Sequence, residues 1–293
     1  MNSVITAKAL SQSHNLFGHE WFYDFRELQH FVKDDKILER MSRKYSGITK
    51  QWTPELNSEW ICRLYLSAKM ILGATLQLES LIYAKRHNLR IVAPYLEYYT
   101  FLSLLRAIVY TLPDADWDNG NLTVIGHKKT INLAFDYITR FNVDGAHQIK
   151  ELTMDLKANR ELISYKLPSS GDSNLKHHDN IVKLATLLAE VAQINSEILE
   201  RSVLKNSDEK NFILLNDYVY HLLNIEIENR AFFDMEDAYR LDYLARKYPL
   251  PTNIMHGMTE GHVEDFFGAW FDEDSDECAF NPDSNWGLIF DVP

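Results

Sequence analysis

This sequence has few of the residues that interrupt or cross-link a polypeptide. Among its 293 residues are 2 cysteines, 8 prolines and 11 glycines. Cys62 and Cys278 are too few for a disulfide framework or a thiolate metal site. No apolar run reaches the roughly 18–20 residues that a membrane-spanning helix needs, and residues 1–16 lack the apolar core of a secretory signal. The sequence therefore predicts a cytoplasmic protein without a membrane segment.

The phosphate-binding and nucleophilic motifs of several large enzyme classes are also missing. The chain contains no Gly-x-Gly-x-x-Gly or Gly-Lys-Ser/Thr phosphate loop and no Gly-x-Ser-x-Gly turn. These absences disfavour an ATPase, a dehydrogenase or an α/β hydrolase, and no cofactor is predicted. Asp114, Asp116 and Asp118 alternate like calcium ligands, but the glycine and the final glutamate of an EF-hand loop are missing. We interpret this segment as a polar connection between helices.

Two histidines beside an acidic residue are the other candidate for a metal site. His256 and His262 flank Glu260, and imidazoles and carboxylates are common metal ligands. Gly257 and Gly261 interrupt the helical spacing that would place both imidazoles on one face. We therefore interpret this segment as a surface loop, and no metal site is predicted in the chain.

Charge is divided unevenly along the sequence. The formal net charge is -12. Residues 207–293 contain 19 Asp and Glu but only 5 Lys and Arg, which gives -14, so residues 1–206 carry about +2. Phosphate binding needs clustered Lys and Arg, which disfavours the C-terminal third as a nucleic-acid surface. This third is either a solvated acidic face or a surface that docks on a basic one, in this chain or in a partner.

Apolar residues recur every three to four positions along most of the chain, which is typical of amphipathic helices. The predicted helices span residues 17–41, 55–88, 94–112, 127–141, 146–165, 178–203 and 230–247, and residues 212–223 fit either a helix or a strand. The predicted fold class is all-α. A helical extension (1–54) precedes a helical bundle (55–206), and an acidic, less regular lobe rich in aromatic residues (207–293) follows it.

Aromatic side chains surround an acidic run in the predicted lobe. Residues 272–277 hold five acidic side chains, and the aromatic residues near them are Phe266, Phe267, Trp270, Phe271, Phe280 and Trp286. Acidic charge mixed with aromatics is typical of interaction segments. Large aromatics need a surface to cover them. The body of the same chain and a partner protein both remain open as that surface.

Short sequence motifs in the middle of the chain occur in the order found in a known family. The first group is Tyr95-Leu-Glu-Tyr98-Tyr99 followed by Leu104-Leu105-Arg106-Ala107, and the second is Gly126-His127-Lys128-Lys129. Residues 60–200, about half of the chain, resemble HEPN domains. Small bacterial members of that family similarly carry a Tyr-Tyr pair and an Arg-Ala pair, with a His-Lys-Gly start on the next helix. The resemblance implies a helical bundle with RNA-directed chemistry.

The resemblance also implies a catalytic motif, which is incomplete here. Catalytic HEPN domains use an arginine, an adjacent polar residue and a histidine four to six residues beyond, and they often dimerise. Arg160 and Glu161 match the first two positions, but Tyr165 stands where the histidine is expected. A tyrosine with an ordinary pKa near 10 is a poor base at neutral pH. A second formal match joins Arg140 to His147 across an expected interhelical loop, residues 142–145.

Three hypotheses follow for the function. The first is a HEPN-like interaction or regulatory protein of a bacterial toxin–antitoxin or antiviral defence system, catalytically degenerate, with a protein partner and with RNA or a second copy of the chain as further partners. The second is an active metal-independent ribonuclease that uses Arg160 or the Arg140–His147 pair. The third is a structural helical protein that binds a partner and has no nucleic-acid role.

Overall fold

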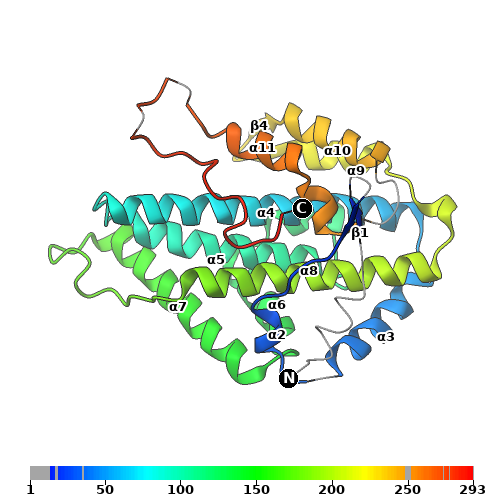
Figure 1. The fold of residues 1–293 in the computed structure, drawn as a ribbon, viewed down its shortest axis with the longest axis horizontal. Helices are drawn as coiled ribbons and strands as arrows, with labels where there is room; N and C mark the ends of the chain where they lie inside the picture. Colours follow the sequence, from blue (N-terminus) through cyan, green and yellow to red (C-terminus); the bar gives the residue numbers. More distant parts are fainter. Residues whose placement is uncertain are drawn as a thin grey trace.

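Three long helices lie side by side through the middle of the protein: α4 (Pro54–Arg86), α5 (Ala93–Tyr110) and α8 (Ile181–Asn206) (Figure 1). The structure is a computed structural model, and it describes residues 14–16, 19–34, 36–247, 252–272, 274–276 and 278–292. In these residues the only sheets are two-stranded hairpins. The predicted all-α class is therefore confirmed.

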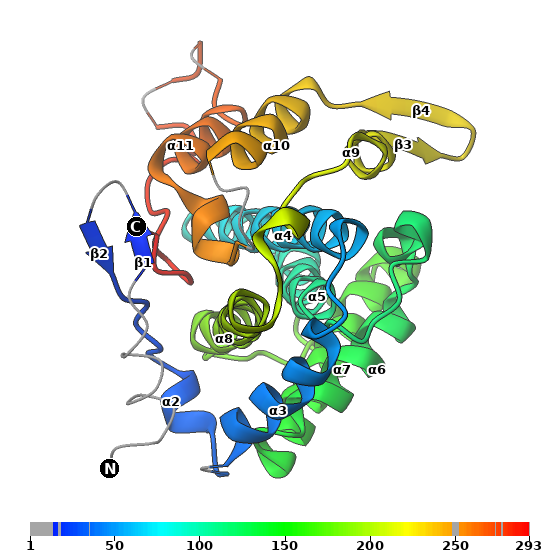
Figure 2. The ribbon, with the colours of Figure 1, turned by 90° about the vertical axis from the view of Figure 1, so that its right-hand side faces the viewer.

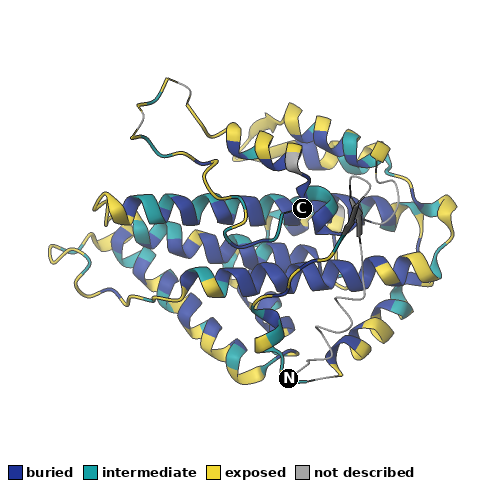
Figure 3. Ribbon diagram, in the orientation of Figure 1, coloured by how far each residue is buried: buried dark blue, intermediate teal, exposed yellow. Residues whose placement is uncertain are grey.

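The start of α4 shows why the central helices are easy to recognise. Thr53 is extended, and its hydroxyl accepts a hydrogen bond from the backbone N–H of Leu56, while Pro54 occupies the first turn. Asn88 adopts a left-handed conformation where α4 turns into α5. α5 contacts α4 and α8 as well as α6 (His127–Ile138) and α7 (Val143–Lys166). Most of α5 is therefore buried, as Figure 3 shows.

The predicted helices of the bundle agree with α4 to α8 to within a few residues at each end. A short 3-10 helix, η1 (Asp118–Val124), precedes α6. On the other side of the molecule, α2 (Leu28–Phe31) and α3 (Ile37–Thr49) pack on α8. Figure 2, which turns the molecule by 90°, separates α3 and α8 from the layer above α4.

The C-terminal third forms that upper layer. Its elements are α9 (Asn216–Leu223), β3 (Asn224–Ile227), β4 (Arg230–Phe233), α10 (Met235–Lys247), η3 (Ile254–Met258) and α11 (Glu260–Gly268). α9, η3 and α11 all contact α4. The chain then returns to the body, where Phe290 is 1% exposed and its ring lies 4.8 Å from that of Tyr23. One hydrophobic core therefore includes side chains from all three predicted segments.

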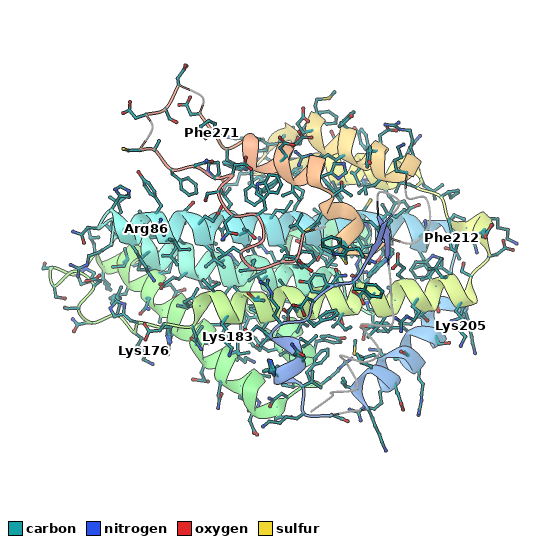
Figure 4. All side chains as sticks on the ribbon, viewed as in Figure 1. Arg86, Lys176, Lys183, Lys205, Phe212 and Phe271 are labelled. Atoms are coloured by element: carbon teal, nitrogen blue, oxygen red, sulfur yellow. The ribbon has the colours of Figure 1, made fainter. Side chains whose placement is uncertain are left out.

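Some aromatic residues of the C-terminal third are covered by the chain itself and others are exposed. Phe267 is fully buried, whereas Trp270 is 64% exposed and Phe271 is 43% exposed. Figure 4 shows Phe271 where the chain leaves α11, in the upper layer. Docking on the body thus accounts for part of this aromatic set, and the remainder faces solvent.

The predicted helix over residues 17–41 is confirmed only in part, because helix occupies residues 28–31 and 37–41 of the described residues in this range. β1 (His14–Leu16) and β2 (His19–Trp21) form a hairpin, and helix begins only at α2. The buried carboxylate of Glu190 accepts hydrogen bonds from the backbone N–H groups of Arg26, Glu27 and Leu28, at the turn that leads into α2. The helix also continues beyond the predicted end at residue 41, since α3 extends to Thr49.

Two expectations for the C-terminal third need similar correction. Residues 230–233 belong to β4 and not to a helix, because Glu228 and Asn229 both adopt left-handed conformations and close a β3–β4 hairpin. Helix α10 starts after Asp234, whose carboxylate accepts hydrogen bonds from two backbone N–H groups of its first turn.

The segment around His256 and His262 is not a surface loop. It folds into η3 and α11, in which Met255 and Val263 are fully buried against the body. The buried apolar side chains compensate for the low helix propensity of Gly261, so that tertiary packing overrides the local preference. His262 is itself only 7% exposed.

Candidate functional site

The bundle brings Arg160 of α7 against two consecutive tyrosines of α5. The guanidinium carbon of Arg160 lies 5.1 Å from the ring centre of Tyr98 and 5.9 Å from that of Tyr99. A guanidinium over an aromatic face is a favourable cation–π arrangement. The Arg160 side chain is 12% exposed, Tyr98 is fully buried and Tyr99 is 37% exposed. Tyr99 is therefore the member of this group whose side chain is most accessible to solvent.

His127, the first residue of α6, completes this cluster. Its Nδ1 atom lies 2.8 Å from the hydroxyl oxygen of Tyr98, and its ring is perpendicular to that of Tyr99. The N-cap residue of α6 is Gly126, which offers no side chain to the free backbone N–H groups of the first turn. A helix N-terminus with free N–H groups attracts anions.

The charges around His127 are mostly positive. Its pKa is lowered, first by burial and then by the charges of Arg106, Arg160 and Lys157, against the opposing charge of Glu161. The imidazole is therefore neutral at pH 7 and could accept a proton. Lys128 and Lys129 are exposed on the first turn of α6, and they line an open hollow of about 590 Å³ with His127.

Two arginines at this cluster carry unused donors. The Nε–H groups of Arg106 and Arg160 are buried, and no acceptor in the described part of the chain bonds to either of them. A buried donor without an acceptor costs free energy. An anionic acceptor would satisfy these donors. We define Tyr98, Tyr99, Arg106, His127 and Arg160 as the arginine–tyrosine site.

The structure brings the residues of the first predicted motif, Arg160, Glu161 and Tyr165, close together. Glu161 lies 3.9 Å from the Arg160 guanidinium, and the Tyr165 hydroxyl forms a hydrogen bond that helps to raise the pKa of Arg160 against the effect of burial. Tyr165 is otherwise 73% exposed.

Arg140 and His147 do not meet. Arg140 stacks on Tyr137, 4.9 Å from its ring centre, and His147 is an exposed residue of α7. No hydrogen bond or ion pair that the structure describes joins the two. The expected interhelical loop is also shorter than predicted, because Asn142 caps α7 and the helix begins at Val143.

Sequence reasoning placed His127 in a helix start but did not recognise it as the histidine beside Arg160. The two residues are 33 positions apart, so no spacing rule along one helix connects them. The signal that could have found the contact is the Tyr98-Tyr99 pair, because adjacent tyrosines on a helix can reach two neighbouring helices at once.

Comparison of the chain with family models, with curated proteins and with solved structures gives no match. Within the described residues, no helix has the length and apolar character required to cross a bilayer.

Proposed function

We propose that the bundle is a HEPN-like module that binds RNA at the arginine–tyrosine site. The observation that carries the proposal is the pair of arginines with buried, unpartnered Nε–H groups beside the free N-terminus of α6. Guanidinium groups and helix N-termini are the usual ligands of phosphate. The exposed part of Tyr99 supplies a ring on which a base can stack, which is a common way to hold single-stranded RNA.

The charge distribution also supports this location. The acidic residues of the chain concentrate after residue 206, whereas this site belongs to the segment that carries about +2. Lys128, Lys129 and Lys157 add positive charge around it. Long-range attraction would therefore bring a polyanion to α5, α6 and α7 and keep it away from the acidic C-terminal third.

The proposed role is binding or regulation because the family's catalytic histidine position is occupied by Tyr165. The setting that we propose, a bacterial toxin–antitoxin or antiviral defence system, rests on the resemblance to HEPN domains alone. In such a setting the chain would act as an RNA-binding partner of another protein.

A protein-binding surface is part of the proposal. The β3–β4 hairpin projects from the upper layer (Figure 2) and exposes Ile227, Phe232 and Phe233, each more than half exposed. Because the surrounding third carries -14, a partner with basic residues around an apolar contact fits it best. A Phe232→Ser, Phe233→Ser double variant should lose that partner in a pull-down, and recovery of the same proteins would contradict this part.

One observation favours ribonuclease activity as a second candidate function. His127 is neutral at pH 7 because its pKa is lowered by burial and by nearby cations, and a neutral imidazole can accept the proton of a 2'-hydroxyl. Arg160 is one of the cations that lower the pKa of His127, and in this candidate function its guanidinium would stabilise negative charge on the phosphate. In this reading His127, and not Tyr165, takes the place of the family histidine.

Arginine substitutions test the proposed site. We expect Arg160→Ala to weaken binding of a single-stranded RNA at low salt by at least about tenfold, because it removes a phosphate ligand and the cation–π contact. Arg140→Ala is the matched control. Arg140 also stacks on a tyrosine, but it lies beyond the far end of α6, about 20 Å along the helix axis from His127. Fluorescence anisotropy with a labelled oligonucleotide measures both.

Equal losses of RNA affinity in Arg160→Ala and Arg140→Ala would show that affinity depends only on total charge. That result would contradict RNA binding at the arginine–tyrosine site. Incubation of the same RNA with the unchanged protein and with His127→Ala separates the two functions. Cleavage that depends on His127 would establish the ribonuclease, and binding without cleavage would support the degenerate module.

A further inference from the structure

A second polar pocket lies between α4, α10 and α11, in the layer above α4. Its volume is about 840 Å³, within the range of small-molecule sites. It shares no residue with the arginine–tyrosine site, which is built from α5, α6 and α7. Lys69 of α4 and Arg240 of α10 contribute the positive charges of its lining, and Trp270 contributes an aromatic ring beyond the end of α11.

Arg240 is a buried cation for which the described residues supply no ion pair. Its residue is 6% exposed, and its Nε–H is buried with no acceptor in the described part of the chain. The buried carboxylate that shares the pocket lining is that of Asp237, but it already accepts from other donors. Lys69 Nζ lies 2.7 Å from Oδ1 and 2.5 Å from Oδ2 of Asp237, and the Tyr65 hydroxyl donates to Oδ1 as well.

A buried arginine normally pairs with a carboxylate or a phosphate, because an uncompensated charge away from water is unfavourable. Here Asp237 is occupied by two other donors, and no ion pair to Arg240 is present among the residues that the structure describes. The guanidinium is therefore set up to receive an anionic group that enters the pocket. A carboxylate matches its planar donors with two parallel hydrogen bonds.

The rim of the pocket has the opposite charge. The exposed acidic residues that line it are Asp234, Glu236, Glu264 and Asp265, and Trp270 is 64% exposed. Inorganic phosphate or sulfate would be repelled by these four carboxylates. A cation on the same molecule would be attracted by them and could stack on the face of Trp270. A ligand that matches these charges has one negative group, which contacts Arg240, and one positive group, which contacts the acidic rim.

We propose that this pocket binds a small zwitterion with a carboxylate at one end and a guanidinium or ammonium group at the other. The carboxylate pairs with Arg240, and the cation lies among the rim acids beside Trp270. A basic amino acid is one such molecule, either free or as the last residue of a peptide.

Calorimetric titration of the full chain with L-arginine and with agmatine tests the proposal. Agmatine has the same side chain as arginine but lacks the carboxylate. We expect agmatine to bind at least about tenfold more weakly, since Arg240 then stays unpaired. The Arg240→Gln variant should weaken L-arginine by a similar factor and leave agmatine unchanged. The matched control is Arg246→Gln, which removes an exposed arginine from the same helix.

The rim is tested separately by Glu264→Gln, an exposed substitution that leaves the core intact. It should weaken both L-arginine and agmatine. A tripeptide Gly-Gly-Arg, compared with free L-arginine, distinguishes a peptide terminus from a free amino acid as the natural source. Equal affinity of the unchanged protein for L-arginine and agmatine, or no heat of binding with millimolar L-arginine, would overturn the proposal even if Arg240→Gln fails to fold.

Discussion

Replacement of Arg63 by alanine is expected to lower the free energy of unfolding by about 3–5 kcal/mol, the range for breaking a buried ion pair from one side. Arg63 is 2% exposed. Its guanidinium donates to the backbone carbonyls of Tyr110, Leu112 and Ala115 and pairs with Glu59 at 2.6 Å. The alanine variant removes the guanidinium donor from these carbonyls, which lie at the end of α5 and just beyond it. Urea unfolding followed by circular dichroism measures the loss.

Arg43→Ala is the matched control for this prediction. Arg43 also follows a glutamate by four residues, Glu39, at 3.7 Å, but its side chain is 80% exposed. Exposed pairs of this kind contribute about 0.5 kcal/mol or less. Similar losses in Arg43→Ala and Arg63→Ala would contradict the role of Arg63 as the residue that holds the end of α5 against α4.

The stability of the protein is expected to contain a pH-dependent contribution from Glu190. This carboxyl is fully buried, and burial raises its pKa from 4.5 to about 7, although the backbone N–H groups of Leu28, Glu27 and Arg26 oppose the rise. Between these two values the folded protein holds a proton that the unfolded chain has lost. The contribution to stability is therefore complete below pH 4.5 and is lost as the pH rises to 7, by about 3 kcal/mol.

A Glu190→Gln variant tests this contribution because glutamine has no charge to lose. The free energy of unfolding of the unchanged protein should fall relative to that of Glu190→Gln as the pH rises from 5 to 8. Glu151→Gln, which removes an exposed carboxylate from α7, should leave the pH dependence as it is. Parallel pH profiles for the unchanged protein and Glu190→Gln would disprove the assignment.

Local sequence patterns were sufficient to predict the helices that have capping residues and a long apolar periodicity. Thr53 and Pro54 mark the start of α4, and the apolar periodicity of α4 to α8 continues over many turns. The N-terminal hairpin could not be found in this way. The turn that follows it depends on hydrogen bonds to Glu190, which is more than 160 positions away in the sequence.

Contacts between distant parts of the sequence also could not be predicted at the arginine–tyrosine site. Arg160, Glu161 and Tyr165 lie on one helix, so their neighbourhood follows from the helical repeat. The contact of Arg160 with Tyr98 and the approach of His127 depend on how α5, α6 and α7 cross. The β3–β4 turn is a smaller example. Glu228 and Asn229 take the left-handed conformations that sequence rules expect from Asn-Gly.

The salt dependence of RNA affinity tests the central claim most directly. Each phosphate that a protein neutralises in a single strand contributes about 0.7 to the slope of the logarithm of the binding constant against the logarithm of salt concentration. If Arg160 contacts a phosphate, the slope for Arg160→Ala should be smaller by about this amount than the slopes for the unchanged protein and Arg140→Ala. Identical slopes for all three proteins, or no RNA binding at low salt, would contradict an RNA-binding site at Arg160.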